Sequence, residues 1–224
     1  MDTTAVALSL KLAAVTLLLL MPGALALARW LAVTHSRIKP WVEGLVALPL
    51  VLPPTVIGYY LLVSLGAASP LGRGIESLTG QRLVFSFAGL VFASVLVNIP
   101  FAVQPMQRAF EAIAPEVREA AQCCGLTFAQ ALARIELPLA WPGILSAAVL
   151  SFAHTLGEFG VVLMVGGNIP GQTQTIAISI YDRVQAFDTG AAGTMALLLL
   201  VLSLGTIALS YGLGGRLMQA RAAR

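Results

Sequence analysis

The chain has 224 residues, of which 58% are hydrophobic and only 10% are charged, and its formal net charge is +3. The mean hydropathy is +0.89, so the chain has more apolar surface than the core of a soluble domain of this length can bury. This excludes an ordinary soluble protein. We also expect no nucleic-acid partner. Several runs reach the roughly 20 apolar residues that cross a bilayer, without the alternation of barrel strands. These features predict an all-α integral membrane protein with a single transmembrane domain over residues 1–224.

Five membrane spans are predicted, over about residues 10–30, 42–66, 83–103, 141–165 and 191–213. The apolar run of the first span begins directly after Lys11, as in a secretory signal. The rest of the chain is equally apolar, so we interpret this run as a retained span. The positive-inside rule predicts an amino terminus outside and a carboxyl terminus in the cytoplasm of a bacterial plasma (inner) membrane. That orientation puts nine of the 13 basic residues inside: Arg29, Arg37, Lys39, Arg108, Arg118, Arg134, Arg216, Arg221 and Arg224.

The second predicted span is rich in residues that disturb a helix. It contains Pro49, Pro53, Pro54 and Gly58, and each proline removes an intrahelical hydrogen bond that another group must replace. We therefore expect an imperfect helix that lies inside a bundle or beside a water-filled path.

Polar side chains occur in the third and fourth predicted spans, where contact with lipid would be costly. In the fourth span they recur at helical positions i, i+3, i+4 and i+7, so they are expected to share one face. This face fits hydrogen bonding between helices and the lining of a path equally well. With Asn168, which opens an expected turn on the outer face, the candidate pathway or gate residues are Ser94, Asn98, Ser151, His154, Thr155, Glu158 and Asn168.

The segment 105–140 would be cytoplasmic and predicts a hairpin of two short helices. Pro115 suits a first helical position, Gly125 suits a left-handed helix end, and Pro138 is expected to end the second helix. At about ten residues, roughly 15 Å, each helix is too short to span a membrane. The hairpin either docks with a partner or packs on its own bundle.

A possible capping box, formed by Thr127 and Gln130, marks the start of the second hairpin helix. The adjacent cysteines, Cys123 and Cys124, are interpreted as small buried residues without a disulfide.

The spacing Glu119-Ala120-Ala121, three residues, Gly125, nine residues and Ile135-Glu136-Leu137-Pro138 resembles the signature of ABC-importer permease subunits. The resemblance implies a type I importer permease in which this loop couples the membrane domain to a separate ATP-binding subunit. It implies these coupling residues: Glu119, Ala120, Ala121, Gly125, Ile135, Leu137 and Pro138. Cys123 and Cys124 lie inside the signature without an assigned role.

Three other stretches, "LPLVLPPTVIGYYLLVSLG", "LGEFG" and "NIPGQTQTI", resemble molybdate ABC transporter permeases. The last two are shared with sulfate and thiosulfate permeases, so sulfate or thiosulfate stands as the alternative substrate, and tungstate is a further candidate. The resemblance implies a homodimer that binds ATP-binding subunits and a periplasmic or lipid-anchored molybdate-binding protein, surrounded by membrane lipid. We expect no cofactor or metal on this chain, which has no Walker phosphate loop, so ATP is used by the partner.

Two other function classes fit parts of the pattern. His154 and Glu158, one helical turn apart, would suit a proton-coupled secondary transporter, and Ser151 with His154 would suit a membrane hydrolase. The span interiors lack an obvious central lysine or arginine, so tight anion binding is expected on a separate protein. We interpret Glu158 as a paired or gating group, and residues 175–188 as a short outer or re-entrant helix rather than a strand.

Overall fold

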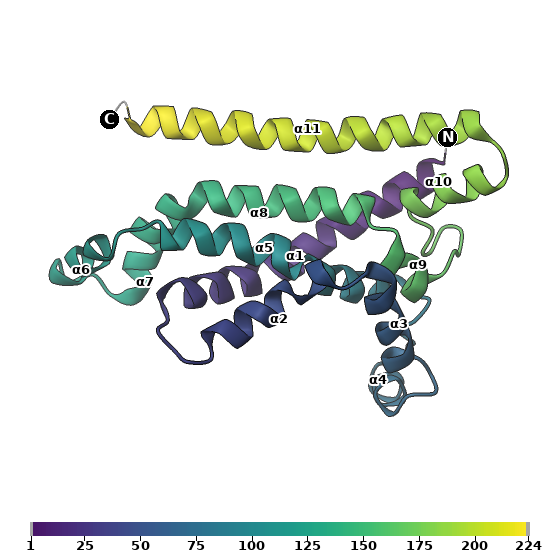
Figure 1. Cartoon of the computed structure of the whole chain (residues 1–224), viewed down its shortest axis with the longest axis horizontal. Coiled ribbons are helices and arrows are strands. Elements are labelled where there is room, and N and C mark those ends of the chain that lie inside the picture. The colour runs from purple at the N-terminus through teal and green to yellow at the C-terminus, as the bar shows by residue number, and fades with distance from the viewer. Residues whose placement is uncertain (1, 223–224) are drawn as a thin grey trace.

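A computed structural model describes the backbone of residues 2–222 and the side chains of residues 2–206 and 208. Its regular elements are all helical within the described residues (Figure 1), which confirms the all-α fold class. They are α1 (Thr3–Val33), α2 (Lys39–Val51), α3 (Pro54–Leu65), α4 (Pro70–Thr79), α5 (Phe87–Glu111), α6 (Pro115–Cys123), α7 (Phe128–Ala131), the π-helical turn η1 (Leu132–Glu136), α8 (Leu137–Gly157), α9 (Gly160–Gly166), α10 (Ile176–Gln185) and α11 (Thr189–Ala222).

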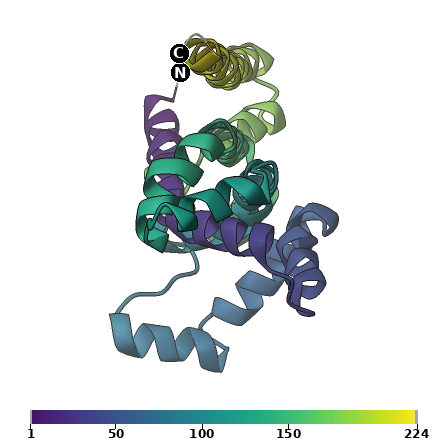
Figure 2. The same cartoon turned by 90° about the vertical axis from the view of Figure 1, so that its left-hand side faces the viewer.

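The core lies where α1, α5 and α8 pack side by side (Figures 1 and 2). Small residues such as Ala28, Ala102, Ala140 and Ala147 are fully buried there, around the larger side chain of Phe110. Small residues let helix backbones approach closely, which is how helices associate in a membrane without a hydrophobic driving force. The central three-helix bundle thus forms the frame on which the other elements are mounted.

Four described helical segments are long and apolar enough to cross a membrane: Thr3–Val33, Phe87–Glu111, the continuous Phe128–Gly157, and Thr189–Thr206. The bent pair α2 and α3 makes a fifth if it counts as one span, in agreement with the expected number. The predicted bounds 83–103 were wrong for the third span. Ser86 caps α5 by accepting a hydrogen bond from the Gly89 N–H, and the helix then continues through two prolines to Glu111.

The second predicted span is not one imperfect helix but two helices, and the chain bends by 106° between them. Leu52 and Pro53 both adopt extended backbone, with ψ of 136°. A proline disfavours helical geometry in the residue before it, so the consecutive Pro53 and Pro54 break the helix instead of kinking it. As a result α3 and α4 project away from the central bundle (Figures 1 and 2).

The fourth predicted span, 141–165, is also broken. The helix α8 ends at Gly157, Glu158 has an extended ψ of 125°, and α9 begins at Gly160. The expectation that Glu158 lies at position i+7 of one continuous helical face was therefore wrong.

The predicted hairpin is present, but its second arm differs from the expectation. Pro115 opens α6, Gly125 follows it with φ of +74°, and Thr127 and Gln130 form the expected capping box. Pro138 does not end the second helix, because α7 continues through the π-helical turn into α8. A proline near the start of α8 is tolerated because the wider turn before it already departs from the regular hydrogen-bond ladder. The bend of α6 against α7 is thus the hairpin, and the predicted loop limits 105–140 include parts of α5 and α8.

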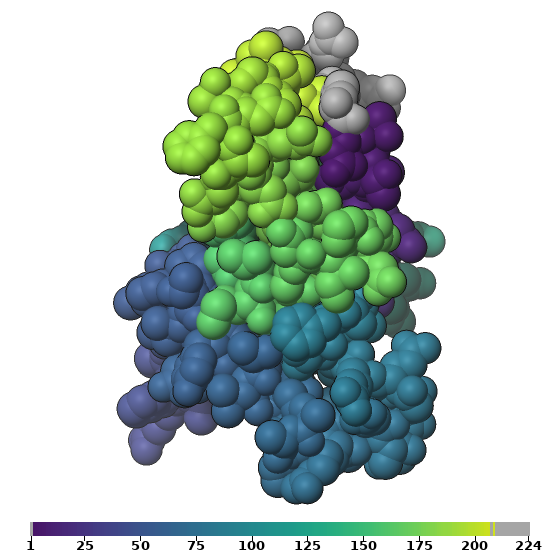
Figure 3. Space-filling model, turned by 90° about the vertical axis from the view of Figure 1, so that its right-hand side faces the viewer, coloured from purple at the N-terminus to yellow at the C-terminus, as the bar shows by residue number. Residues whose placement is uncertain are grey.

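At the other end of the molecule, α9 and the turn after it lie between α3–α4 and the start of α11 (Figure 3). Gly171, with φ of +75°, sits in the expected turn that begins at Asn168. Residues Ile176–Gln185 form the helix α10, which excludes the strand alternative. The helices α1 and α11 both run from this end toward the hairpin end (Figure 1).

Candidate coupling hairpin and translocation path

The tip of the hairpin presents part of the implied coupling signature to the outside. Glu119, Ala120 and Gly125 are exposed, whereas Ala121 is buried. A glycine is needed at position 125 because its positive φ is strained for residues with a Cβ. Cys123 and Cys124 are free and exposed, so their expected burial was wrong. The hairpin protrudes from one end of the bundle (Figure 1), where a partner could reach its tip.

The base of the hairpin carries the other half of the signature. Ile135, Leu137 and Pro138 are partly buried where η1 joins α8. Between them Glu136 is only 3% exposed, and it accepts hydrogen bonds from Nε and Nη2 of Arg29 at 2.9 and 2.8 Å. The coupling signature leaves Glu136 as a variable position, although a carboxylate at the edge of an apolar run already requires a partner.

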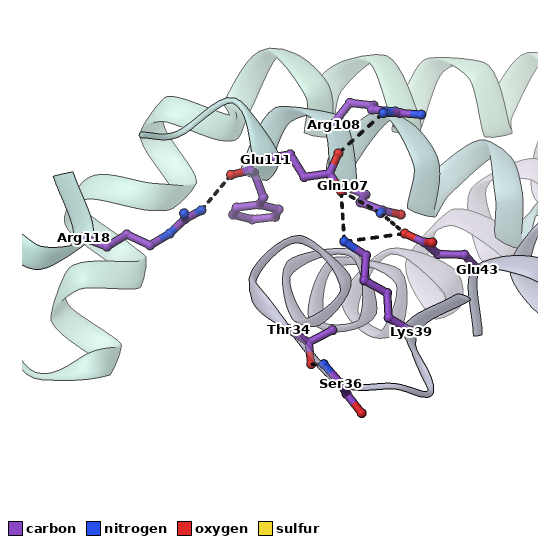
Figure 4. Close-up of polar contacts among 9 residues, drawn as sticks. Thr34, Ser36, Lys39, Glu43, Gln107, Arg108, Glu111 and Arg118 are labelled. Atoms are coloured by element: carbon purple, nitrogen blue, oxygen red, sulfur yellow. Dashed lines mark hydrogen bonds and ion pairs between the residues drawn. The ribbon is translucent and has the colours of Figure 1, made fainter. Parts of the chain in front are cut away.

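A second arginine joins this carboxylate to the end of α5. Arg118 of α6 (labelled in Figure 4) donates from its Nη2 to the Phe110 carbonyl at 2.7 Å. Its Nε lies 3.6 Å from Oε2 of Glu136. Arg29 also lies over the ring of Phe128, 4.4 Å from its centroid. We call Arg29, Arg118 and Glu136 the hairpin-base cluster. It connects α1, α6 and η1 directly, and reaches α5 and α7 through Phe110 and Phe128.

A further polar network at the same end ties α2 to α5 (Figure 4). Lys39 lies 3.8 Å from Glu43 and 3.6 Å from Glu111, while Gln107 donates to both carboxylates at 2.7 and 2.9 Å. These groups line a cavity of about 440 Å³. Because α2 is otherwise largely exposed, this network is its main polar attachment to the bundle.

Four of the candidate pathway residues are buried in the helix interface instead. Ser94 and Asn98 of α5 and Ser151 and Thr155 of α8 are at most 3% exposed. Asn98 donates to the Thr155 hydroxyl at 3.0 Å, and Thr155 in turn donates to the Ser151 carbonyl at 2.8 Å. Asn98 and Thr155 therefore hydrogen-bond α5 to α8, whereas the hydroxyls of Ser94 and Ser151 have no hydrogen-bond partner among the described residues.

The remaining pair of the polar face, His154 and Glu158, lies beside a cavity where the two broken helices meet. The cavity has a volume of about 180 Å³ and is bordered by the α2–α3 break and by Val97 and Phe101 of α5. The Glu158 carboxylate accepts a hydrogen bond from the Val161 N–H at 3.0 Å and lies 3.7 Å from Nε2 of His154. Glu158 thus caps the start of α9 at the break, where the unpaired N–H groups of a helix favour negative charge.

Glycines bring the two outer helices of this junction together. A Cβ on Gly58 of α3 would lie 2.7 Å from the Met164 Cβ and 3.2 Å from the Val161 Cα of α9. A Cβ on Gly160 would lie 2.9 Å from the Pro54 Cβ. The breaks in the second and fourth spans therefore pack directly on each other, and α3 with α9 forms a single structural unit.

The last candidate, Asn168, is not part of this junction. Its amide donates to Asp182 of α10 at 2.7 Å, and Gln174 donates to the same carboxylate oxygen at 2.9 Å. This arrangement pins the turn to α10 on the end opposite the hairpin. Ser151 is buried between helices whereas His154 faces the cavity, so the structure does not assemble them as a nucleophile and base.

Broken membrane helices around a cavity, with an exposed helical hairpin at one end, define a multi-pass membrane transport subunit. Comparison with known proteins supports this class. Residues 9–218 match the family described as "Binding-protein-dependent transport system inner membrane component", and the chain belongs to this family.

The similar proteins include two that are called molybdenum transport system permease protein ModB. The one from Azotobacter vinelandii is 48% identical over 195 residues, which cover 87% of this chain and 86% of that protein. The one from Haemophilus influenzae is 36% identical and covers 98% of this chain and 96% of that protein. A solved bacterial alginate ABC transporter, in complex with an alginate-bound periplasmic protein, has a similar fold, with a TM-score of 0.77 over 96% of this chain and 78% of that chain at 20% identity.

Proposed function

We propose that this chain is the inner-membrane permease subunit of an ATP-driven importer of molybdate. The observation that carries the proposal is the exposed hairpin at one end of the bundle, formed by residues with the complete coupling signature. Glu119, Ala120 and Gly125 lie on its accessible surface, in reach of a partner protein. The substrate assignment is supported by the names of the two similar permeases, which both refer to molybdenum.

The chain needs partners to perform this transport. Two copies related by a two-fold axis enclose a path between them, since one copy has only four or five spans. Each copy docks one ATP-binding subunit at its hairpin, and ATP hydrolysis belongs to that subunit. In the membrane the amino terminus faces outward, and the hairpin faces the cytoplasm.

Molybdate affinity resides on a separate extracytoplasmic binding protein. Among the described residues that line the cavity at the two helix breaks, none is a lysine or arginine that would hold a dianion tightly. Both carboxylate oxygens of Glu158 are near partners, the Val161 N–H and the His154 ring. Such a site lets an anion pass weakly, and the breaks in α2–α3 and α8–α9 provide the movable elements of a gate.

Lipid and the second copy cover the large apolar surface. Leu18, Leu19, Trp41 and Leu45 are each more than half exposed in the isolated chain. An area of this character is stable only in contact with hydrocarbon or with another protein.

The decisive experiment is uptake of labelled molybdate into vesicles that contain the permease, its ATP-binding subunit and its binding protein. We expect uptake that requires ATP and is blocked by excess tungstate but not by sulfate. Blockage by sulfate would move the chain to the sulfate and thiosulfate transporters. Uptake that persists without ATP and follows a proton gradient would support the secondary-transporter alternative, in which His154 and Glu158 carry the proton.

A further inference from the structure

The hairpin-base cluster carries an inference that rests on the proposed function and extends it. We infer that Arg29, Arg118 and Glu136 are positioning residues that transmit the movement of the hairpin to α1, α5 and α8. Arg29 and Glu136 lie outside the hairpin tip, and Arg118 directly precedes its first residue, Glu119. Their role is mechanical, and it concerns how tightly ATP use and uptake are linked.

The contact between Arg29 and Glu136 is buried and bidentate. Both oxygens of the carboxylate are engaged, at 2.9 and 2.8 Å, and the two side chains are only 18% and 4% exposed. Surface ion pairs contribute little because water and salt screen them, whereas a buried bidentate pair has a defined geometry. The contact joins residues 107 positions apart in the chain, so α1 must follow any displacement of η1.

An incomplete contact lies on the other side of the carboxylate. The Nε of Arg118 is buried without a hydrogen-bond partner among the described residues, 3.6 Å from Oε2 of Glu136. This separation is longer than a hydrogen bond, and a buried donor without a partner is unfavourable. Movement of α6 toward η1 by less than about 1 Å would complete the bond. Because Arg118 also donates to the carbonyls of Phe110 and Ile113, the same movement would pull on the end of α5.

The local backbone at Glu136 is suited to a movable joint. Glu136 is the last residue of the π-helical turn between α7 and α8, where the Leu137 N–H bonds to the Leu132 carbonyl. Such turns inside α-helices are often found at functional sites. Arg29 contacts both sides of this turn, through Phe128 before it and Glu136 at its end. The cluster therefore stabilises η1 from both sides, at the point where the hairpin joins α8.

The test uses the complete transporter in vesicles and measures ATP hydrolysis and molybdate uptake in the same preparation. Glu136→Gln removes the charge, and Arg29→Lys keeps the charge but loses the bidentate geometry. We expect each to lower the ratio of molybdate transported to ATP hydrolysed by about three- to tenfold, while the ATP-binding subunit still co-purifies. The matched control is Glu76→Gln, which removes the charge from the more exposed pair that Glu76 of α4 forms at 2.9 Å with Arg82 after that helix, and it should leave the ratio unchanged.

An unchanged ratio in intact complexes of both variants would overturn the inference. Failure of both variants to assemble would also overturn it, since the cluster would then serve only to hold the fold. Gly125→Asp in the hairpin tip separates this inference from the proposed function. If that variant uncouples and the cluster variants do not, the inference alone fails, whereas ATP-independent uptake by the unchanged protein removes the proposed function itself.

Discussion

The hairpin base and the junction of broken helices are built in opposite ways. At the hairpin base, two arginine side chains, one from α1 and one from α6, meet around the buried carboxylate of Glu136. At the junction, α3 and α9 touch through Gly58 and Gly160, where there is no room for an added Cβ. Arginine side chains can re-form contacts after a small displacement, but touching backbones cannot.

This difference indicates which parts of the molecule can move during transport. The α3–α9 unit should move as a rigid body, with its hinges at the breaks near Pro53 and Glu158. The hairpin should move together with α1 and the end of α5, because its base cluster connects it to them. Changes of size should therefore damage the junction, and changes of charge should damage the hairpin end.

The largest effect is expected from Gly58→Ala at the junction. The new Cβ would overlap the Met164 Cβ, and the free energy of unfolding should fall by about 2 kcal/mol because packed helices must separate. Thermal unfolding of the purified transporter in detergent measures this change. Gly44→Ala in α2 is the control, since its Cβ meets nothing within 4 Å, and equal stability of the two variants would refute the tight junction.

The next largest effect concerns the hairpin tip, where Glu119→Lys reverses an exposed charge. The fold should be unaffected, because surface substitutions rarely change stability, but uptake should fall by about tenfold at a retained rate of ATP hydrolysis. Gly125→Asp should act similarly, with additional strain at its φ of +74°. Normal uptake with either variant, present in the membrane in normal amount, would contradict the coupling role.

A smaller effect is expected from Glu158→Gln at the start of α9. The amide can still accept from the Val161 N–H, but it loses the favourable interaction of a charge with the helix start, which typically contributes about 0.3–1 kcal/mol. Uptake should fall by about two- to fivefold, since 1.4 kcal/mol corresponds to a factor of ten. Asp2→Asn is a matched control, because Asp2 caps α1 through Ala5 three residues on, as Glu158 does with Val161. Equal effects of the two variants on uptake would show that Glu158 has only a structural role.

The smallest effect is expected where α2 is tied to α5. Lys39 and Glu111 are 28% and 29% exposed and 3.6 Å apart, so the pair should contribute no more than about 0.5 kcal/mol after screening by water. Lys39→Met should change uptake by less than about twofold, and mainly at low salt. Uptake measured at two salt concentrations checks this, and a large, salt-independent loss would show that the network acts as more than a weak tie.

Part of the candidate site could be predicted from the residues alone. The helix start at Pro115, the capping box of Thr127 with Gln130, and the left-handed Gly125 depend on interactions within four residues, and all three are confirmed. By contrast, the polar face of the fourth span was only half right. Thr155 hydrogen-bonds to Asn98 of α5, while Glu158 lies beyond the end of α8, because the break at that position is not visible in the spacing of polar residues.

Composition and short-range geometry were enough to specify the membrane class, the approximate number of spans and the helical hairpin. Three other features became visible only in the folded chain: Glu136 is clamped by Arg29, the helix continues from α7 through η1 into α8 and past Pro138, and Gly58 and Gly160 join two broken helices. The first and third depend on partners far away in the chain or on the space between packed backbones, and the second depends on a π-helical turn that the position of the proline does not reveal. A helical period reports which way a side chain faces but not what it meets there.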